Sequence, residues 1–454
     1  MSKERNMSKE RSSFSGKIGF VLAAAGSAVG LGNIWRFPYL AAKYGGGIFL
    51  LVYLILAVTF GFALMVAEIA IGRKTGKSPF EAYKALSSKW AFLGKLTTIV
   101  PIIIFPYYCV IGGWVMKYAV IFFKGQLEAA AGASYFGNYI AQPIEPIVWL
   151  ILFITITAVV VIMGVQKGIE KASKVMMPVL AVLAVVIALF VVCRPEAIEG
   201  LKFYLLPDFS KFSVMTVLSA MGQLFYSMSL AMGIMITYGS YMKKTESIES
   251  CVKHIEVFDF GIAFTAGLMV IPAVFAFGNG DVNAGPGLMF EVLPRVFNNM
   301  SFGGVVGAAF FILVLMAALT SSISLMETIV SVLQDRLHWN RILSSVVTAL
   351  FSIAVGIPSS LGFGIWSNIK PLNMSILDFF DFTSNSVIMP IVALLTCIFI
   401  GHVTGTKMVS DEVENSGIFK RKKMFEVLIR YIAPVIIILI LLSSVANGLG
   451  IITI

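Results

Sequence analysis

Apolar residues gather in long runs along this chain, and polar or charged stretches separate them. Runs long enough to cross about 30 Å of hydrocarbon, as a transmembrane helix must, recur eleven times. The pattern predicts an all-α membrane protein with eleven transmembrane helices, near residues 18–40, 46–71, 96–123, 147–164, 175–193, 213–238, 257–278, 303–333, 343–358, 374–400 and 431–450.

Basic residues predict the orientation of these helices. The N-terminal tail and every second loop together hold 25 of the 34 Lys and Arg residues, in segments 1–17, 73–95, 167–174, 243–253, 336–341 and 407–430. These segments share one face, which the positive-inside rule makes cytoplasmic. We expect a multi-pass protein of the cell (inner) membrane with its N-terminus inside and its C-terminus outside. The tail has no cleavable signal pattern, so the first run is expected to be retained.

Composition supports the membrane assignment. Hydrophobic residues make up 58% of the chain and charged residues 13%, whereas soluble domains have about 25% charged residues. We therefore expect most of the chain to be surrounded by membrane lipid. The net charge of +10 follows from the cytoplasmic loops, and no nucleic-acid partner is expected. Four scattered cysteines predict neither disulfides nor a zinc site.

Two runs are interrupted by residues that are unfavourable in a lipid-embedded helix. Three glycines within 26–32 precede Asn33 and Arg36, and the sixth run carries a counterpart at 227–233. Interrupted helices at corresponding positions in two halves indicate a transporter's binding site. The alternative is that the glycines are helix-packing notches, but packing does not require Asn33 and Arg36.

Polar features also converge in depth. At 1.5 Å per helical residue, Val29, Tyr108, Ser229 and Thr320 lie ~18–22 Å from the charged ends of their helices. Hydroxyls and free carbonyls at this depth suit sodium and not a soft metal. Free N–H groups at a helix break suit a carboxylate.

The domain organisation follows from the two breaks. We expect a cytoplasmic tail and two inverted five-helix repeats, with helices 1 and 6 unwound at the midplane, and a final helix outside the repeats. The second outer loop, 279–300, is either a re-entrant or capping segment or an ordinary surface loop. The expected parts are 1–17 (tail), 18–193 (helices 1–5), 194–212 (outer loop), 213–400 (helices 6–10), 401–430 (cytoplasmic loop) and 431–454 (helix 11).

The first interrupted segment, GSAVGLGNIWRFPY at 26–39, resembles the signature of the neurotransmitter:sodium symporter family. Weaker matches follow in order at 68–73, 107–108, 222–225, 237–241 and 319–322, so the resemblance covers nearly the whole chain. The chain is similar to the shorter prokaryotic members. The resemblance implies a leucine-transporter-like fold and sodium-coupled import of an amino acid by alternating access.

The resemblance also implies functional residues by position. The first of two Na+ sites would use Ala28, Asn33, Ser227 and Asp259. The second would use Gly26, Val29, Ala317, Thr320 and Ser321. Substrate would contact Ser27, Ala28, Gly30, Leu31, Gly32, Ile104, Tyr108, Tyr226, Ser227, Ser229, Met232, Ser321 and Leu325. An outer gate would use Arg36, Gln223 and Asp381, an inner gate Arg11, Tyr241 and Asp335, and Glu68 would support the helix break.

Each of these residues also has an ordinary structural explanation. Hydroxyls in membrane helices often bond to their own backbone, a buried Tyr often only packs, and surface ion pairs contribute little. Three positions depart from the common family pattern: Tyr226 replaces Phe, Ala231 replaces Gly, and Asp259 stands where chloride-dependent relatives have Asn. Asp259 also lies only ~9 Å from Lys253 by helical rise, so either helix 7 begins in the cytoplasm or the alignment fails there.

Gly30 stands where monoamine carriers of the family have Asp, so the substrate is expected to bring its own carboxylate. We predict a neutral hydrophobic L-amino acid, with an aromatic amino acid or a small amino-acid-like osmolyte as the alternative. No chloride requirement is expected, because Asp259 can supply the compensating charge. The sequence is compatible with a homodimer.

Two other functional classes compete with a carrier. An intramembrane enzyme is not expected, because the three histidines, His254, His338 and His402, all lie on cytoplasmic loops or helix ends. A channel or a non-transporting sensor on the same fold remains open as the second alternative.

Overall fold

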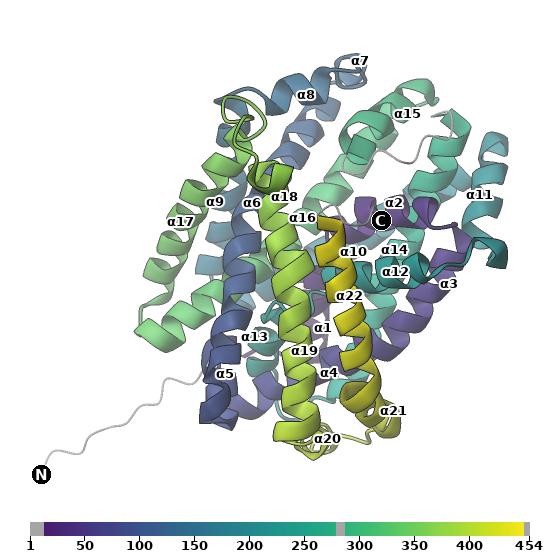
Figure 1. The fold of residues 1–454 in the computed structure, drawn as a ribbon. Helices are drawn as coiled ribbons and strands as arrows, with labels where there is room; N and C mark the ends of the chain where they lie inside the picture. The colour runs from purple at the N-terminus through teal and green to yellow at the C-terminus, as the bar shows by residue number, and fades with distance from the viewer. Residues whose placement is uncertain (1–12, 278–286, 449–454) are drawn as a thin grey trace, which may run out of the picture.

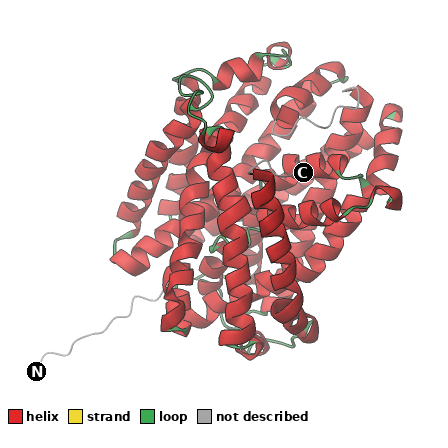
Figure 2. Ribbon diagram, in the orientation of Figure 1, coloured by secondary structure: helices red, strands yellow, loops and turns green. Residues whose placement is uncertain are grey.

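The computed structural model describes residues 13–277 and 287–448, and this part of the chain is built of helices joined by short loops (Figure 1, Figure 2). Within it the extended pairing is a single isolated bridge between Gly46 and Pro207. The predicted all-α membrane class is confirmed.

The first half of the bundle runs to residue 192. Its elements are α1 (Lys17–Ala28), η1 (Gly32–Arg36), α2 (Phe37–Lys43), α3 (Gly47–Leu56), η2 (Ala57–Gly61), α4 (Phe62–Thr75), α5 (Pro79–Leu86), η3 (Ser88–Trp90), α6 (Ala91–Phe123), α7 (Leu127–Ala130), α8 (Tyr135–Ile140), α9 (Glu145–Ile162), η4 (Val165–Glu170) and α10 (Lys171–Val192).

The second half follows a loop that carries short helices of its own. Its elements are η5 (Pro195–Ala197), α11 (Ile198–Leu205), η6 (Phe209–Lys211), α12 (Val214–Ser227), α13 (Ile234–Ser240), α14 (Ile248–Phe277), η7 (Leu288–Val292), α15 (Leu293–Asn299), α16 (Gly303–Leu337), α17 (Arg341–Leu361), η8 (Pro371–Asn373), α18 (Ile376–Asp381), η9 (Phe382–Ile388), α19 (Met389–Ile398), η10 (Phe399–Val403), α20 (Thr406–Glu414), α21 (Lys422–Val427), η11 (Leu428–Ile432) and α22 (Ala433–Gly448).

The long helices make this a multi-pass membrane protein. Among the described residues, 9 helices are long and apolar enough to span, or up to 10 if the bent pair Lys17–Ala28 and Gly32–Lys43 is one span. The sixth predicted run consists of α12, with 14 residues, and α13, with 7 residues. Each is too short to span by itself, so the total of eleven stays a prediction.

The two halves of helices 1 and 6 are separated by non-helical backbone. Val29 is extended, with φ −77° and ψ 93°, and the two parts of the first helix are bent by 53°. Between α12 and α13, Ser229, Ala231 and Gly233 have positive φ values of 52°, 59° and 75°. The two helices are therefore interrupted at the positions that the sequence predicted.

The packing of other helices holds the two breaks inside the bundle. α16 packs along α6, α1 packs against α14 and α16, and α13 packs against α4. α19 and α22 lie side by side, α7, α8 and α15 lie at one end of the bundle, and α5, α20 and α21 lie at the other (Figure 1).

The described part of the second outer loop is a cap on the bundle. Leu288, Met289, Phe290 and Leu293 in this segment are buried. The Tyr118 hydroxyl on α6 donates to the Phe290 carbonyl at 2.9 Å. This packing favours the capping alternative over an ordinary surface loop for residues 287–300.

Candidate functional site

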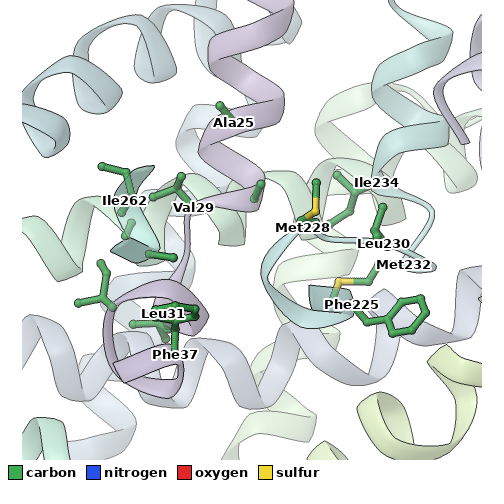
Figure 3. Packing of buried hydrophobic residues seen from close by; sticks show 14 of the residues in the cluster. Ala25, Val29, Leu31, Phe37, Phe225, Met228, Leu230, Met232, Ile234 and Ile262 are labelled. Atoms are coloured by element: carbon green, nitrogen blue, oxygen red, sulfur yellow. The ribbon is translucent and has the colours of Figure 1, made fainter. Parts of the chain in front are cut away.

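A small cavity lies between the two helix breaks. Figure 3 shows the chain leaving α1 near Val29 and turning at Leu31, opposite the loop that runs from Met228 through Met232 to Ile234. Every residue predicted to contact substrate lines this cavity, and so does Ile234, which was not predicted. The lining is Ser27, Ala28, Gly30, Leu31, Gly32, Ile104, Tyr108, Tyr226, Ser227, Ser229, Met232, Ile234, Ser321 and Leu325.

The cavity contains one unsatisfied hydroxyl. The Tyr108 hydroxyl is buried and has no hydrogen-bond partner among the described residues. A Cβ added to Gly30 would lie 3.3 Å from this oxygen and 2.6 Å from the Ser321 hydroxyl. Because an unpaired buried hydroxyl is costly, this geometry suits a ligand that brings a hydrogen-bond acceptor beside Gly30.

Asp259 is the centre of a buried polar cluster beside the cavity. Its side chain is fully buried. Its Oδ1 accepts from the Asn33 amide at 2.7 Å, and its Oδ2 lies 3.0 Å from the Tyr53 hydroxyl and 3.5 Å from that of Ser227. Three of the four residues predicted for the first sodium site thus lie together. Ala28, the fourth, is the last residue of α1.

The depth of Asp259 no longer conflicts with this arrangement. α14 begins at Ile248, and several residues of its first turns, including Ile248, Glu249 and Val252, are already buried. Lys253 therefore lies inside the helix and does not mark its beginning. That helix 7 begins in the cytoplasm stays a prediction.

Tyr53 is a site residue that the sequence analysis missed. Its hydroxyl lies 2.5 Å from Ser227 and 3.0 Å from Asp259, and its ring packs edge-on against Phe37 with centroids 4.9 Å apart. A tyrosine inside the apolar run 46–71 was the available signal. Sequence spacing could not reveal its partners, because they lie on helices far along the chain.

The residues predicted for the second sodium site lie where α1 meets α16. Thr320 donates to the Ala317 carbonyl at 3.0 Å, and Ser321 lies 3.5 Å from the Gly26 carbonyl. Ser321 also donates to the Ser27 carbonyl at 3.0 Å. These oxygens form a neutral group of hydroxyls and carbonyls at the end of α1, beside the extended Val29.

Glu68 holds the break in helix 6. One carboxylate oxygen accepts from the Ala231 N–H at 2.7 Å, and the other, also buried, has no partner in the described part of the chain. Ala231 has the left-handed φ of 59°, which favours glycine. Glu68 therefore binds the backbone of the same turn in which the family commonly has a glycine.

The residues predicted for the outer gate do not form the ion pair that would close it. Arg36 lies over the Tyr226 ring, 5.2 Å from its centroid, and Gln223 donates to the Gly32 carbonyl at 2.8 Å. Asp381 accepts from Tyr107 at 3.0 Å. Within residues 13–277 and 287–448 the structure has no ion pair between Arg36 and Asp381.

Part of the inner gate can be described. Arg11 lies outside the described residues. Asp335 accepts from the Ser78 N–H at 2.7 Å, and the Tyr241 hydroxyl donates to Glu327 at 2.8 Å. Glu327 forms an ion pair with Arg341, a pair that the sequence analysis did not identify.

Comparison with known proteins agrees with this architecture. The family model of the sodium:neurotransmitter symporter family matches residues 11–143 and 138–450. An uncharacterized sodium-dependent transporter of Bacillus subtilis, YhdH, is 37% identical over 94% of this chain and 96% of its own length. An uncharacterized sodium-dependent transporter of Haemophilus influenzae is 32% identical over 96% of this chain and 98% of its own.

A solved structure matches as well. The crystal structure of MhsT in complex with L-phenylalanine aligns with a TM-score of 0.87 at 36% identity, over 96% of this chain and 100% of that one. The homologues are transporters and not enzymes, and sodium dependence is common to their descriptions. With the family model covering nearly its whole length, this chain belongs to the sodium:neurotransmitter symporter family.

Proposed function

We propose that this protein is a secondary active symporter that imports a neutral hydrophobic L-amino acid with sodium by alternating access. The observation that carries the proposal is the unpartnered Tyr108 hydroxyl, buried in the cavity between the two helix breaks. A substrate carboxylate beside Gly30 would accept from this hydroxyl. That position also adjoins the residues of the first sodium site, so cation and carboxylate would neutralise each other.

The rest of the cavity supports an apolar substrate side chain. Ile104, Met232, Ile234 and Leu325 contribute hydrocarbon or thioether surface, and Tyr226 adds one hydroxyl. Since none of the described residues that line the cavity is acidic, an amine without a carboxylate would lack a counter-charge in direct contact. The preference for an aliphatic substrate over Trp rests on the sequence position of Ala231 alone, because Ala231 is not among the described residues that line the cavity. The phenylalanine bound by MhsT makes an aromatic amino acid the main alternative, before a small osmolyte.

Two sodium ions are proposed, one at each group of oxygens. The first would bind beside Asp259, Asn33 and Ser227, and the second between the end of α1 and Thr320 and Ser321. Two cations and a zwitterion leave excess positive charge, which is costly away from water. The buried Asp259 carboxylate would offset that charge, so we propose transport without chloride.

The orientation proposed from the basic loops is retained, with the N-terminus in the cytoplasm and the C-terminus outside. The short helices α5, α20 and α21 would then lie at the cytoplasmic end. We retain the two inverted repeats at 18–193 and 213–400, and the homodimer as one assembly compatible with the sequence.

The test is uptake of each of the twenty amino acids into proteoliposomes, with an inward sodium gradient or an equal potassium gradient. We expect saturable, sodium-dependent accumulation of a neutral hydrophobic amino acid. Preferred high-affinity binding of dopamine, Lys or Glu would contradict the substrate class. Sodium-dependent binding without accumulation would favour the non-transporting sensor, and ion flux without accumulation would favour the channel.

A further inference from the structure

The outer-gate cation and anion are each bound to a different partner in this conformation. The Arg36 guanidinium rests over the Tyr226 ring at 5.2 Å. Asp381 Oδ1 accepts from Tyr107 at 3.0 Å and from Asn385 at 2.6 Å. Asp381 Oδ2 has no donor in the described part of the chain, so each group has unused hydrogen-bonding capacity.

The orientation of the Asn385 amide follows from its neighbours. Its nitrogen donates to Asp381 Oδ1 and, at 3.0 Å, to the Tyr107 oxygen. Because an ionised carboxylate can only accept, the amide nitrogen and not the amide oxygen must face Asp381. The oxygen is thereby directed elsewhere, and it is buried without a donor among the described residues.

A buried amide oxygen without a donor is destabilising, unless another conformation supplies one. Arg36 is close enough to Asp381 to act on its charge and has no ion-pair partner in the described residues, and its planar fork carries several N–H donors for two adjacent acceptors. Asn385 lies four residues after Asp381, in η9. One helical turn therefore places both acceptors on the same face.

We propose that Asn385 is the second acceptor of the outer gate. On closing, Arg36 leaves the Tyr226 ring and donates to both the Asp381 carboxylate and the Asn385 amide oxygen. Asn385 is thus a positioning residue that slows the release of bound substrate to the outside. This inference rests on the proposed function, because it requires a substrate that is enclosed by the gate.

The test measures dissociation of a radiolabelled amino acid, the one selected by the uptake screen, from the full-length protein in sodium. Asn385→Ala is expected to release it about tenfold faster, the change expected from losing one hydrogen bond to a charged group. In an Arg36→Ala background the same substitution is expected to change the rate by less than about twofold, because its donor is already gone.

Tyr107→Phe is the matched control. It removes the other donor to Asp381 Oδ1 and leaves the Asn385 oxygen in place, so its effect is expected to be smaller than that of Asn385→Ala. Equal acceleration by Asn385→Ala in the wild-type and Arg36→Ala backgrounds would overturn the proposal. An unchanged rate in Asn385→Ala would overturn it too.

Asn385→Asp covers the case in which Asn385→Ala does not fold. Because a second carboxylate would replace the N–H that Asn385 donates to Asp381, its repulsion of Asp381 is measured in the same variant with Arg36→Ala, and we expect release that is slower with Arg36 present than without it. Release as fast as in Arg36→Ala would overturn the proposal. If the wild type binds no amino acid, the proposed function fails and this inference with it. Binding with unaltered release defeats only the role of Asn385.

Discussion

The two proposed sodium sites differ in how their oxygens are held. At the first, the fully buried Asp259 is tied to Asn33 and Tyr53 by hydrogen bonds of 2.7 and 3.0 Å from three separate segments. At the second, Thr320 and Ser321 donate to main-chain carbonyls of α16 and α1. The first site carries a charged carboxylate within a hydrogen-bonded network. The second site is neutral, and its hydroxyls donate to nearby main-chain carbonyls.

This difference teaches how each site would respond to sodium. Cross-linked polar networks are rigid when satisfied, so the first site would be largely preorganised. At the second site the hydroxyl hydrogens point at carbonyl oxygens, and they would have to turn away before the same oxygens faced a cation. Substitutions should therefore be more damaging at the first site and should mainly change sodium dependence at the second.

The largest effect is expected from Asp259→Asn. Losing the carboxylate removes both a proposed sodium ligand and the compensating charge, and disrupting a buried charged pair costs about 3–5 kcal/mol. We expect sodium-driven uptake to fall by about a hundredfold or more in gluconate, with partial rescue by chloride at most. The wild type should be indifferent to the anion.

The comparison for Asp259 is direct. A wild type that needs chloride, or a mutant that transports normally in gluconate, would show that this carboxylate is not the counter-charge. Sodium-dependent substrate binding is measured in the same two anions. It separates loss of substrate binding from loss of the later step in which the empty carrier turns back to face the outside.

The second expected effect is at the neutral site, in the double variant Thr320→Ala and Ser321→Ala. It removes two of the five proposed oxygens with little change in bulk. We expect the sodium dependence of uptake to shift to higher concentration, and substrate affinity at fixed sodium to weaken by a coupling energy of ~1–3 kcal/mol. Unaltered sodium dependence would show that the site is misassigned.

The third effect tests the network around Asp259 and not its charge. Tyr53→Phe removes the hydroxyl shared by Ser227 and Asp259, and a hydrogen bond to a charged group contributes about 1.5–3 kcal/mol. We expect roughly tenfold weaker sodium-dependent binding. Tyr83→Phe is the control, since it removes a buried hydroxyl that pairs with Thr396. Equal effects of the two substitutions would make Tyr53 an ordinary packing residue.

The smallest effect is expected at the break in helix 6. Ala231→Gly relieves a left-handed φ of 59°, worth ~1–2 kcal/mol, and part of the gain is offset by the entropy of glycine. We expect a modest rise in thermal stability. Ala220→Gly in α12, where the backbone is helical, should lower stability instead. A lower melting temperature for Ala231→Gly would mean that the turn is not strained.

The sequence predicted much of the cavity because the breaks are local features. Glycines and Asn33 within one lipid-spanning run interrupt it wherever the chain folds, and the family signature then placed the lining residues by position. The predicted set matches the cavity lining except for Ile234, which restarts helix 6. Tyr53 and Asn385 escaped because neither carries a local signal beyond being polar in an apolar run.

The sequence by itself determined the membrane class, the breaks in helices 1 and 6 and the types of residue at the cavity. These follow from hydrophobic run length and local backbone preference, which need no knowledge of distant contacts. Tertiary structure alone decided that Asp259 lies beside Asn33 and Tyr53, that Arg36 rests on Tyr226, and that Asn385 holds Asp381. Most of these partners come from helices far apart in the chain, and only the packing of those helices brings a charge and its hydrogen-bonding group together.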